Sequence, residues 1–172
     1  QSLGNLRKVL HELRHALPGI ERFLRIDTRT LHWQNDGPFV LDVALFDDLL
    51  ARVEENSHQP ATERGLLEEA VALYRGDLLP NCYDDWILPI RERLRHAFQG
   101  ALERLIGLAE SEQDYAAAIA HANHLLRYEP TQETIYRRLM QLHLLLGDRA
   151  AALNVYHTCA TTLQRELDVS PG

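Results

Sequence analysis

The sequence predicts a mainly α-helical protein, an array of helical hairpins preceded by one helix and a short β-hairpin. Three observations predict this class. Apolar residues recur at three- and four-residue spacing along most of the chain, as in amphipathic helices. One stretch near the N-terminus is instead rich in β-branched and aromatic residues, and the C-terminal half repeats its own pattern. We expect two parts, residues 1–40 and residues 41–172.

The first part begins with an amphipathic helix over residues 3–17. Its apolar stripe consists of Leu3, Leu6, Leu10, Leu13 and Leu17. Pro18 and Gly19 end the helix. The following stretch "FLRIDTRTLHW", residues 23–33, has two short apolar runs around a polar centre and predicts a β-hairpin or two short strands. "NDGP", residues 35–38, has the composition of a turn.

The second part is helical throughout. Asp42 is placed to cap the first of its helices, and Asp84 stands before the third. We expect Tyr74 and Trp86 to be buried where the first helices meet the repeat. Helices are expected at about residues 42–55, 61–74 and 86–109.

An internal repeat is the strongest signal in this part. The matching pairs are Leu102 and Tyr136, Leu105 and Leu139, Asp114 and Asp148, Ala118 and Ala152, and Ala122 and Tyr156. Their common spacing is the 34-residue tetratricopeptide period, and Ala118 and Ala152 stand where paired helices approach most closely. The register predicts a tetratricopeptide-like array of helical hairpins. Such arrays usually offer a surface to another protein.

Charge divides the chain in the same way. The net charge is −7, which by itself disfavours nucleic-acid binding. Residues 1–33 hold six basic and three acidic residues, a net of +3, whereas residues 34–172 hold 12 basic and 22 acidic residues, a net of −10. This asymmetry indicates two parts with different partners, although a short window also fluctuates by chance.

Several classes of protein are excluded by composition. There is neither an apolar run of membrane-spanning length nor a signal-peptide pattern, so we expect a cytoplasmic protein without membrane contacts. Cys82 and Cys159 are far apart and form no CxxC motif, which disfavours a disulfide scaffold. Position 1 is Gln rather than Met, as in an excised fragment.

The motif "HELRH", residues 11–15, fits the H-E-x-x-H pattern of zinc peptidases. A catalytic zinc site also needs a third ligand and a dry cavity. His11 and His15 instead project away from the leucine stripe, on a face with three cations that would repel Zn²⁺, and His32 is only a conceivable third ligand. We therefore expect no catalytic residue, no metal and no cofactor, and keep a zinc hydrolase as an alternative.

The same face fits a recognition helix in the major groove of DNA, because arginine can bind guanine edges while lysine and histidine contact phosphates or bases. A hairpin with basic residues would then contact the DNA backbone as a wing. The candidate DNA-binding residues are Arg7, Lys8, His11, Arg14 and His15 in the helix, and Arg25 and Arg29 in the hairpin. The alternative is a charged face that is merely solvated. A helix followed by a hairpin forms the back half of a winged helix-turn-helix.

From residue 42 onward the chain resembles the bacterial transcriptional activator domain of Streptomyces antibiotic regulatory proteins. The motifs that carry the resemblance are "DVALF" (42–46), "ALYRGDLLP" (72–80), "DDWILPIRERL" (84–94), "DYAAAIAHANHLLRYEPTQE" (114–133), "LMQLHLLLGDRAAALNVY" (139–156) and "LQRELDVSP" (163–171). In that family an OmpR-type winged helix precedes this domain, and "NLRKVLHELRHAL" resembles the end of its recognition helix. Asp168 stands where the family commonly has glycine, which is expected to alter the cap of the last helix.

This resemblance implies a non-enzymatic regulatory module of a transcription activator. Promoter DNA would bind through the complete winged helix, and the helical domain would mediate dimerisation or contact RNA polymerase or another domain of the same chain. About fifty residues of the winged helix would precede Gln1, so we expect weak or no specific DNA binding by these 172 residues alone. The alternative is a tetratricopeptide-type scaffold with no role at DNA.

Overall fold

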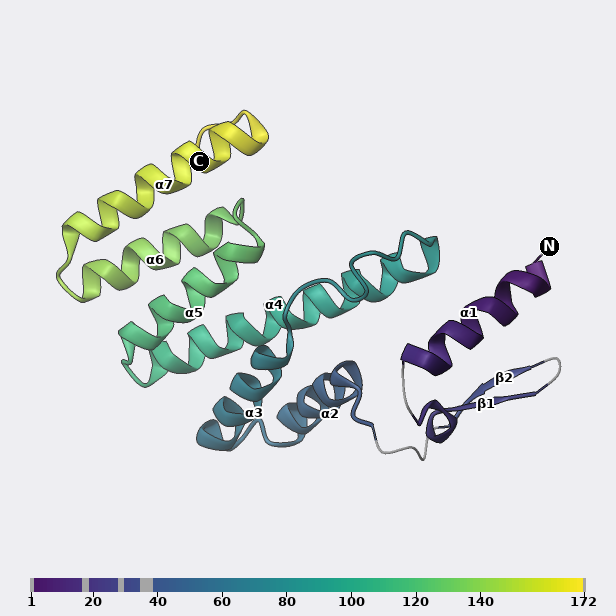
Figure 1. Cartoon of the computed structure of the whole chain (residues 1–172). Coiled ribbons are helices and arrows are strands. Elements are labelled where there is room, and N and C mark those ends of the chain that lie inside the picture. Colours follow the sequence, from purple (N-terminus) through teal and green to yellow (C-terminus); the bar gives the residue numbers. More distant parts are fainter. Residues whose placement is uncertain (1, 17–18, 28–29, 35–38, 172) are drawn as a thin grey trace. The chain divides into compact units, whose positions relative to one another are not determined.

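The computed structural model describes residues 2–16, 19–27, 30–34 and 39–171 (Figure 1). The chain divides into two compact units, Gln1–Leu41 and Asp42–Gly172. The elements of the first unit are α1 (Ser2–Ala16), the 3₁₀ turn η1 (Ile20–Arg22), β1 (Leu24–Ile26) and β2 (Leu31–Trp33). Those of the second are α2 (Asp42–Glu55), α3 (Pro60–Leu73), the 3₁₀ turn η2 (Asp85–Ile87), α4 (Leu88–Ser111), α5 (Tyr115–Tyr128), α6 (Glu133–Leu145) and α7 (Arg149–Leu167).

The first unit contains the predicted helix and the predicted β-hairpin. Strands β1 and β2 pair antiparallel, with Arg25 opposite His32. Gly19 precedes η1 with φ of 82°, a left-handed conformation that glycine adopts at no steric cost. Leu10 and Leu13 of the expected stripe are half-buried. The predictions for Leu17, Pro18 and the 35–38 turn, and for the side chains of Leu3 and Leu6, lie outside the described residues.

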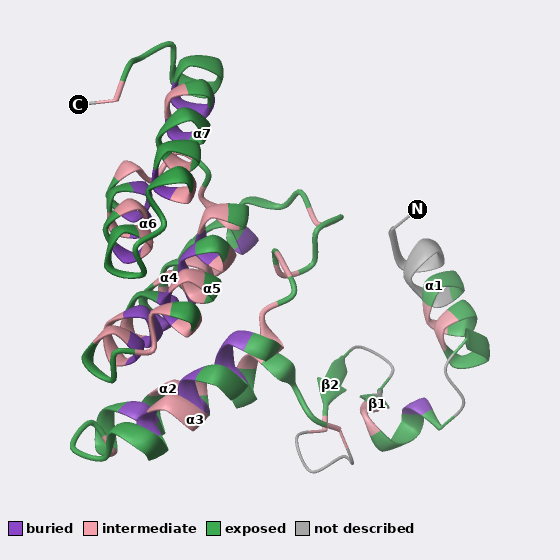
Figure 2. Ribbon diagram, turned by 90° about the vertical axis from the view of Figure 1, so that its left-hand side faces the viewer, coloured by how far each residue is buried: buried purple, intermediate pink, exposed green. Residues whose placement is uncertain are grey.

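The second unit consists of antiparallel helix pairs, α2 with α3, α4 with α5, and α6 with α7 (Figure 1). The helices bury apolar residues between them, and Figure 2 shows buried residues on the faces where helices meet. The core is centred on α4, where Phe98, Leu102 and Ile106 are fully buried. None of the described helices has both the length and the apolarity required to cross a membrane.

The helix ends repeat with the 34-residue period. Asp114 caps α5 and Asp148 caps α7, each by accepting a hydrogen bond from the backbone N–H three residues later, at 3.1 and 2.9 Å. The residues before these caps, Gln113 and Gly147, both have left-handed backbones, with φ of 60° and 76°. The sequence repeat therefore corresponds to a repeat of local structure.

The packing follows the repeat at four of the five predicted pairs. Both members are buried in the pairs Leu102 and Tyr136, Leu105 and Leu139, and Ala118 and Ala152, and Asp114 and Asp148 both cap helices. The fifth pair differs, because Ala122 is fully buried whereas Tyr156 is 46% exposed. The reason is that α6 packs on α5, whereas no further helix follows α7 among the described residues.

Tyr74 and Trp86 have different environments, although both were expected in the core. The ring of Tyr74 stacks on Phe98 with centroids 4.3 Å apart and connects α3 to α4 as expected. The expectation for Trp86 is wrong, since this side chain is 57% exposed. Trp86 lies in η2, whose residues point in three directions, and Ile87 takes the buried one.

Candidate functional site

The basic face of α1 is exposed where the structure describes it. Lys8 and Arg14 both lie in solvent. Lys8 Nζ is 3.9 Å from Glu12 Oε1, and both side chains are more than 60% exposed, so this pair contributes little stability and leaves the ammonium group accessible. At about 100° per residue, Arg14 projects roughly 120° from Lys8, on the flank of the face. The side chain of Arg7 lies outside the described residues.

His11 and His15 are brought together on this face. Their rings pack edge to face with centroids 4.5 Å apart, and both side chains are exposed. Among the described residues no group of three or more His, Cys, Asp or Glu side chains is placed to hold a metal ion. His32, the conceivable third ligand, has its Nε2 atom 3.0 Å from Thr30 Oγ1.

The hairpin presents Arg25 to solvent from β1. Arg25 and His32 are directly opposite in an antiparallel pair, so their side chains share one face of the hairpin. Arg25 Nε is 3.9 Å from the Asp27 carboxylate, and both side chains are more than half exposed. Arg29 lies outside the described residues. The hairpin therefore offers one described basic side chain beside a histidine.

Aromatic packing supports the hairpin from its other end. The rings of Phe23, Trp33 and Phe39 contact one another, with centroid separations between 5.0 and 6.3 Å. Aromatic pairs in edge-to-face or offset geometry add roughly 0.5–1.5 kcal/mol beyond burial. A two-stranded ribbon is marginal alone, so this cluster gives β1 and β2 the support they need.

In the helical unit, Arg91 of α4 holds the long loop between α3 and η2. Its guanidinium donates to the backbone carbonyl of Leu78 at 2.7 Å, to that of Leu79, and to that of Cys82 at 3.0 Å. The planar fork of arginine suits several acceptors at once. One side chain therefore satisfies three carbonyls of the "RGDLLPN" segment and its C-terminal neighbour, and sequence reasoning did not find this role.

One turn further along α4, Arg95 fixes the other side of this loop. Arg95 Nη2 lies 3.0 Å from both carboxylate oxygens of Asp77, and Tyr74 Oη donates to Asp77 at 3.5 Å. Burial raises the pKa of Tyr74, and the nearby carboxylate of Asp77 raises it further. Tyr74 therefore stays protonated and can donate this hydrogen bond at neutral pH.

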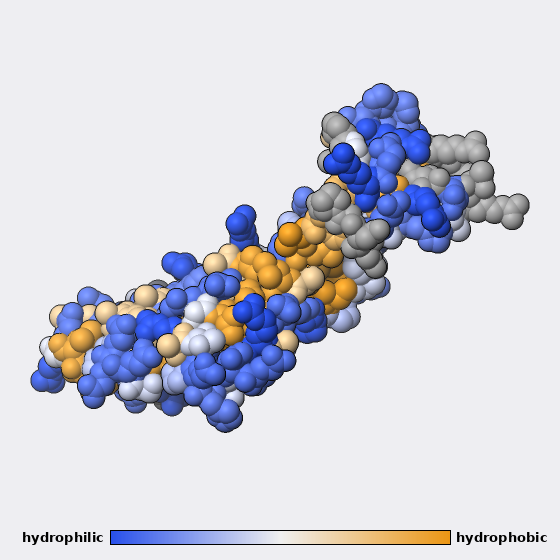
Figure 3. Space-filling model, turned by 90° about the horizontal axis from the view of Figure 1, so that it is seen from below, coloured by the Kyte–Doolittle hydropathy of each residue, from blue (hydrophilic) through white to orange (hydrophobic). Residues whose placement is uncertain are grey.

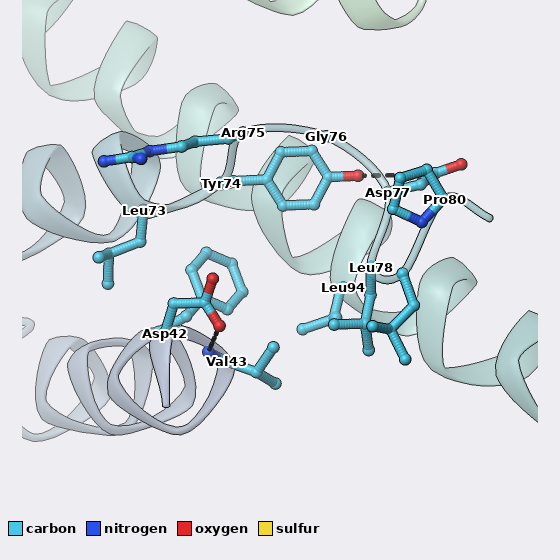
Figure 4. A pocket seen from close by; sticks show the side chains of 12 residues that line it. Asp42, Val43, Leu73, Tyr74, Arg75, Gly76, Asp77, Leu78, Pro80 and Leu94 are labelled. Atoms are coloured by element: carbon cyan, nitrogen blue, oxygen red, sulfur yellow. Dashed lines mark hydrogen bonds between the residues drawn. The ribbon is translucent and has the colours of Figure 1, made fainter. Parts of the chain in front are cut away.

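An apolar cavity of about 470 Å³ opens between α2, this loop and α4 (Figure 4). The side chains of Val43, Phe46, Leu73 and Leu94 form apolar walls, while charged groups lie at the rim. At the rim Asp42 accepts a hydrogen bond from the Val43 N–H at 2.8 Å. The cavity has the size of a small-molecule pocket, which falls between roughly 300 and 1,000 Å³.

Exposed apolar side chains occur in several places on the helical unit, and one run, Leu144, Leu145 and Leu146, lies at the end of α6. A second group belongs to the loop and the start of α4, and a third belongs to α7. Their members are Leu79, Tyr83, Trp86 and Leu88 in the loop and α4, and Leu153, Tyr156 and Leu167 in α7. Figure 3 shows hydrophobic patches on an otherwise hydrophilic face of the molecule. Where such side chains form contiguous apolar surface, that surface is a candidate site of interaction.

Arginines also connect neighbouring helices by ion pairs. Arg104 of α4 donates to Glu63 of α3 and to Glu54 of α2, and Arg138 of α6 donates to Glu110 of α4 with two contacts of 2.6 Å. Arg104 and Arg138 occupy equivalent positions of the repeat, so its register contained a signal for both, which sequence reasoning missed.

These observations define a class of protein, an all-helical unit of stacked antiparallel pairs preceded by a small unit with a helix, a β-hairpin and exposed basic side chains. The model of the bacterial transcriptional activator domain matches residues 41–172, and the chain belongs to this family. The resemblance that the sequence motifs indicated is thereby confirmed. The family is a regulatory, non-catalytic domain. No curated protein matches the chain.

Proposed function

We propose that the chain is the regulatory module of a bacterial transcription activator, acting in the cytoplasm. The helical unit mediates contacts with proteins, among which a second copy of the chain, RNA polymerase and other domains of the same chain are candidates. Residues 1–40 are the C-terminal part of a winged helix-turn-helix. The observation that carries this proposal is the family match over residues 41–172.

The antiparallel helix pairs of the second unit support the role in protein contacts. The 34-residue period joins equivalent caps at Asp114 and Asp148 and equivalent buried alanines at Ala118 and Ala152. Arrays of this kind form extended surfaces, because each repeat contacts only its neighbours and the outer faces stay open. Exposed apolar groups on the loop and on α7 are suitable contact sites on such a surface.

The role at DNA is supported by the side chains of the first unit. Lys8, His11, Arg14 and His15 are exposed on α1, and Arg25 is exposed on β1. None of them is held in a strong ion pair among the described residues, so they are available to phosphates. Arg7 and Arg29 complete the proposed set. With α1 and the hairpin alone, we expect weak DNA binding without sequence preference, with a dissociation constant of about 10⁻⁴ M at physiological salt.

This role is tested by the salt dependence of binding to a labelled DNA duplex, followed by fluorescence anisotropy. Each lost phosphate contact reduces the slope of log K against log salt by about 0.9. The double variant Lys8→Ala/Arg14→Ala should therefore reduce the slope by about 2. Its matched control, Arg75→Ala/Arg127→Ala, removes two exposed cations of the helical unit and should leave the slope unchanged.

A scaffold with no role at DNA is the second candidate, favoured by the net charge of −7 and by the acidic helical unit. It predicts that the two double variants bind DNA equally weakly, with equal slopes. Equal slopes would therefore refute the DNA role and leave the protein-contact role in place.

A further inference from the structure

The proposed function makes no use of the apolar cavity between α2, the loop at residues 74–80 and α4 (Figure 4). Its volume of about 470 Å³ is roughly three times that of an apolar cavity of about 150 Å³ that holds one benzene ring. A ligand of about 10–20 non-hydrogen atoms would therefore fill most of the space.

The loop wall of this cavity is held in place by the protein itself. Arg91 donates a hydrogen bond to the backbone carbonyl of Leu78 at 2.7 Å, and Arg95 lies 3.0 Å from both carboxylate oxygens of Asp77. Tyr74 donates to the same carboxylate at 3.5 Å. Because these contacts already order the wall, a ligand that enters the cavity loses little of its binding energy to ordering the loop.

The interior of the cavity suits an apolar or aromatic group. Phe46 is almost completely buried, and the centroid of its ring lies 6.4 Å from that of Tyr74. Leu73 and Leu94 belong to the apolar walls as well. Walls of this kind bury the hydrocarbon part of a ligand, while the few polar groups of a pocket fix its orientation.

Asp42 places a free negative charge at the rim. Its Oδ1 atom accepts a hydrogen bond from the Val43 N–H at 2.8 Å, which leaves Oδ2 for another donor. Figure 4 shows this carboxylate between Leu73 and Leu94. Across the part of the chain that the structure describes, no cationic side chain lies within salt-bridge distance of it. The α2 dipole adds only about half a positive charge at this end, so the rim keeps a net negative charge here.

The other charges at the rim do not oppose that of Asp42. Asp77 is paired with Arg95 at 3.0 Å. Arg75 is exposed, and Figure 4 shows its side chain extending away from Asp42. Phe46 follows Asp42 by one helical turn, so a cation bound to the carboxylate would also lie near an aromatic ring. The rim therefore favours a cationic head group over an anionic one.

We infer that this cavity binds a small amphipathic amine, with its apolar body between α2 and α4 and its ammonium group on the Asp42 carboxylate. The chemical class is an amine with one positive charge at neutral pH and an aromatic or hydrocarbon body. This inference goes beyond the proposed function, because it gives the helical unit a small-molecule ligand in addition to its protein contacts. It does not depend on that function.

Three probes that share one body and differ in the head group test the charge preference. They are phenylbutylamine, phenylbutanol and phenylbutyrate, each of about 11 non-hydrogen atoms, for which we expect a dissociation constant of about 1 mM with the amine. The alcohol should bind about threefold and the carboxylate about tenfold more weakly, because an exposed ion pair contributes modestly. Titrations of the whole chain followed by amide NMR measure these constants and should show saturable shifts at Val43 and Gly76.

The variant Asp42→Asn tests the role of the carboxylate. Asparagine has the same shape and remains a good cap for α2, so the fold should be kept, as circular dichroism can show. The amine should bind about threefold more weakly and the alcohol unchanged, so that the preference for the amine disappears. The matched control Asp48→Asn removes a charge from the same helix outside the cavity lining and should change nothing. This control separates a local effect from the general attraction of cations to a protein with a net charge of −7.

Several results would overturn the inference. One is the absence of saturable shifts at amine concentrations up to about 10 mM, tenfold above the expected dissociation constant. Others are an alcohol or carboxylate that binds as tightly as the amine, and equal effects of the two variants. Shifts centred on Trp86 or Tyr156 would also overturn it, because the probe would then bind an exposed apolar side chain instead of the cavity. None of these results bears on DNA binding or protein contacts, so the proposed function can fail or stand independently.

Discussion

The turn before α5 places a non-glycine residue, Gln113, in a left-handed backbone conformation that favours glycine. Gln113 has φ of 60°, and Gly147, the equivalent residue one repeat later, has φ of 76°. The hydrogen bonds are equivalent too, because Asp114 N donates to Ala109 O at 2.8 Å and Asp148 N donates to His143 O at 2.9 Å. This is the helix ending in which a left-handed residue, usually glycine, stands just after the helix.

The magnitude follows from the backbone alone. A left-handed conformation costs an L-residue roughly 1–2 kcal/mol that glycine does not lose. Glycine in turn destabilises the folded state by roughly 0.5–1 kcal/mol, because an unfolded chain with glycine has more conformational entropy to lose on folding. The side chain of Gln113 is exposed and makes no hydrogen bond among the described residues, so its removal costs little. We expect Gln113→Gly to raise the free energy of unfolding by about 1 kcal/mol, or the melting temperature by roughly 3 °C.

The reverse change at Gly147 is the matched control. A Cβ atom built at Gly147 meets no atom within 4 Å, so Gly147→Ala changes only the backbone energy and should destabilise by about 1 kcal/mol. Urea unfolding followed by circular dichroism measures both variants. The combined variant should be close to the parent, because the two turns are separate. A Gln113→Gly variant that is no more stable than the parent, or a neutral Gly147→Ala, would refute the reasoning.

Two further predictions concern side chains. Arg91→Ala should destabilise the protein by about 2 kcal/mol in urea unfolding, because three carbonyls lose a charged donor. Arg93→Ala should cost less than about 1 kcal/mol, because its ion pair with Asp47 is half exposed. Equal losses of stability in the two variants would contradict this prediction. Burial lowers the pKa of His121 and of His124 below the ordinary value of 6.5, so the folded state binds fewer protons than the unfolded state. The free energy of unfolding should therefore be highest above about pH 6.5 and fall as the pH drops through the lowered pKa values. His124→Phe should make this fall shallower in urea midpoints measured between about pH 7.5 and 5. An unchanged pH dependence in this variant would contradict the role given to His124.

The repeat in the helical unit could be predicted from the sequence because its signals are local. Asp114 and Asp148 cap helices through their own backbone, and Ala118 and Ala152 are small because the helix partner is always close. The β-hairpin could be predicted for the same reason, since its register depends on neighbouring residues. Helix boundaries agreed with the expected ones to within a few residues.

Long-range contacts could not be predicted in this way. Trp86 was expected in the core because large aromatic residues usually are, but its neighbour Ile87 occupies the buried direction of η2. Arg91 contacts a loop 9 to 13 positions earlier, and Arg104 reaches Glu63 from another helix. Such pairings depend on how helices pack, which a one-dimensional pattern does not specify.

The candidate site also has features that the sequence alone determines and features that depend on tertiary structure. The sequence alone determined which residues of α1 are basic and which side of the helix they share, because helical geometry fixes the angle between positions. Only the tertiary structure decided which apolar faces stay open. Tyr156 of α7 stands at the same position of the repeat as the buried Ala122 of α5, yet Tyr156 is 46% exposed. Burial of this helix face requires a neighbouring helix, which α5 has in α6 and α7 lacks among the described residues.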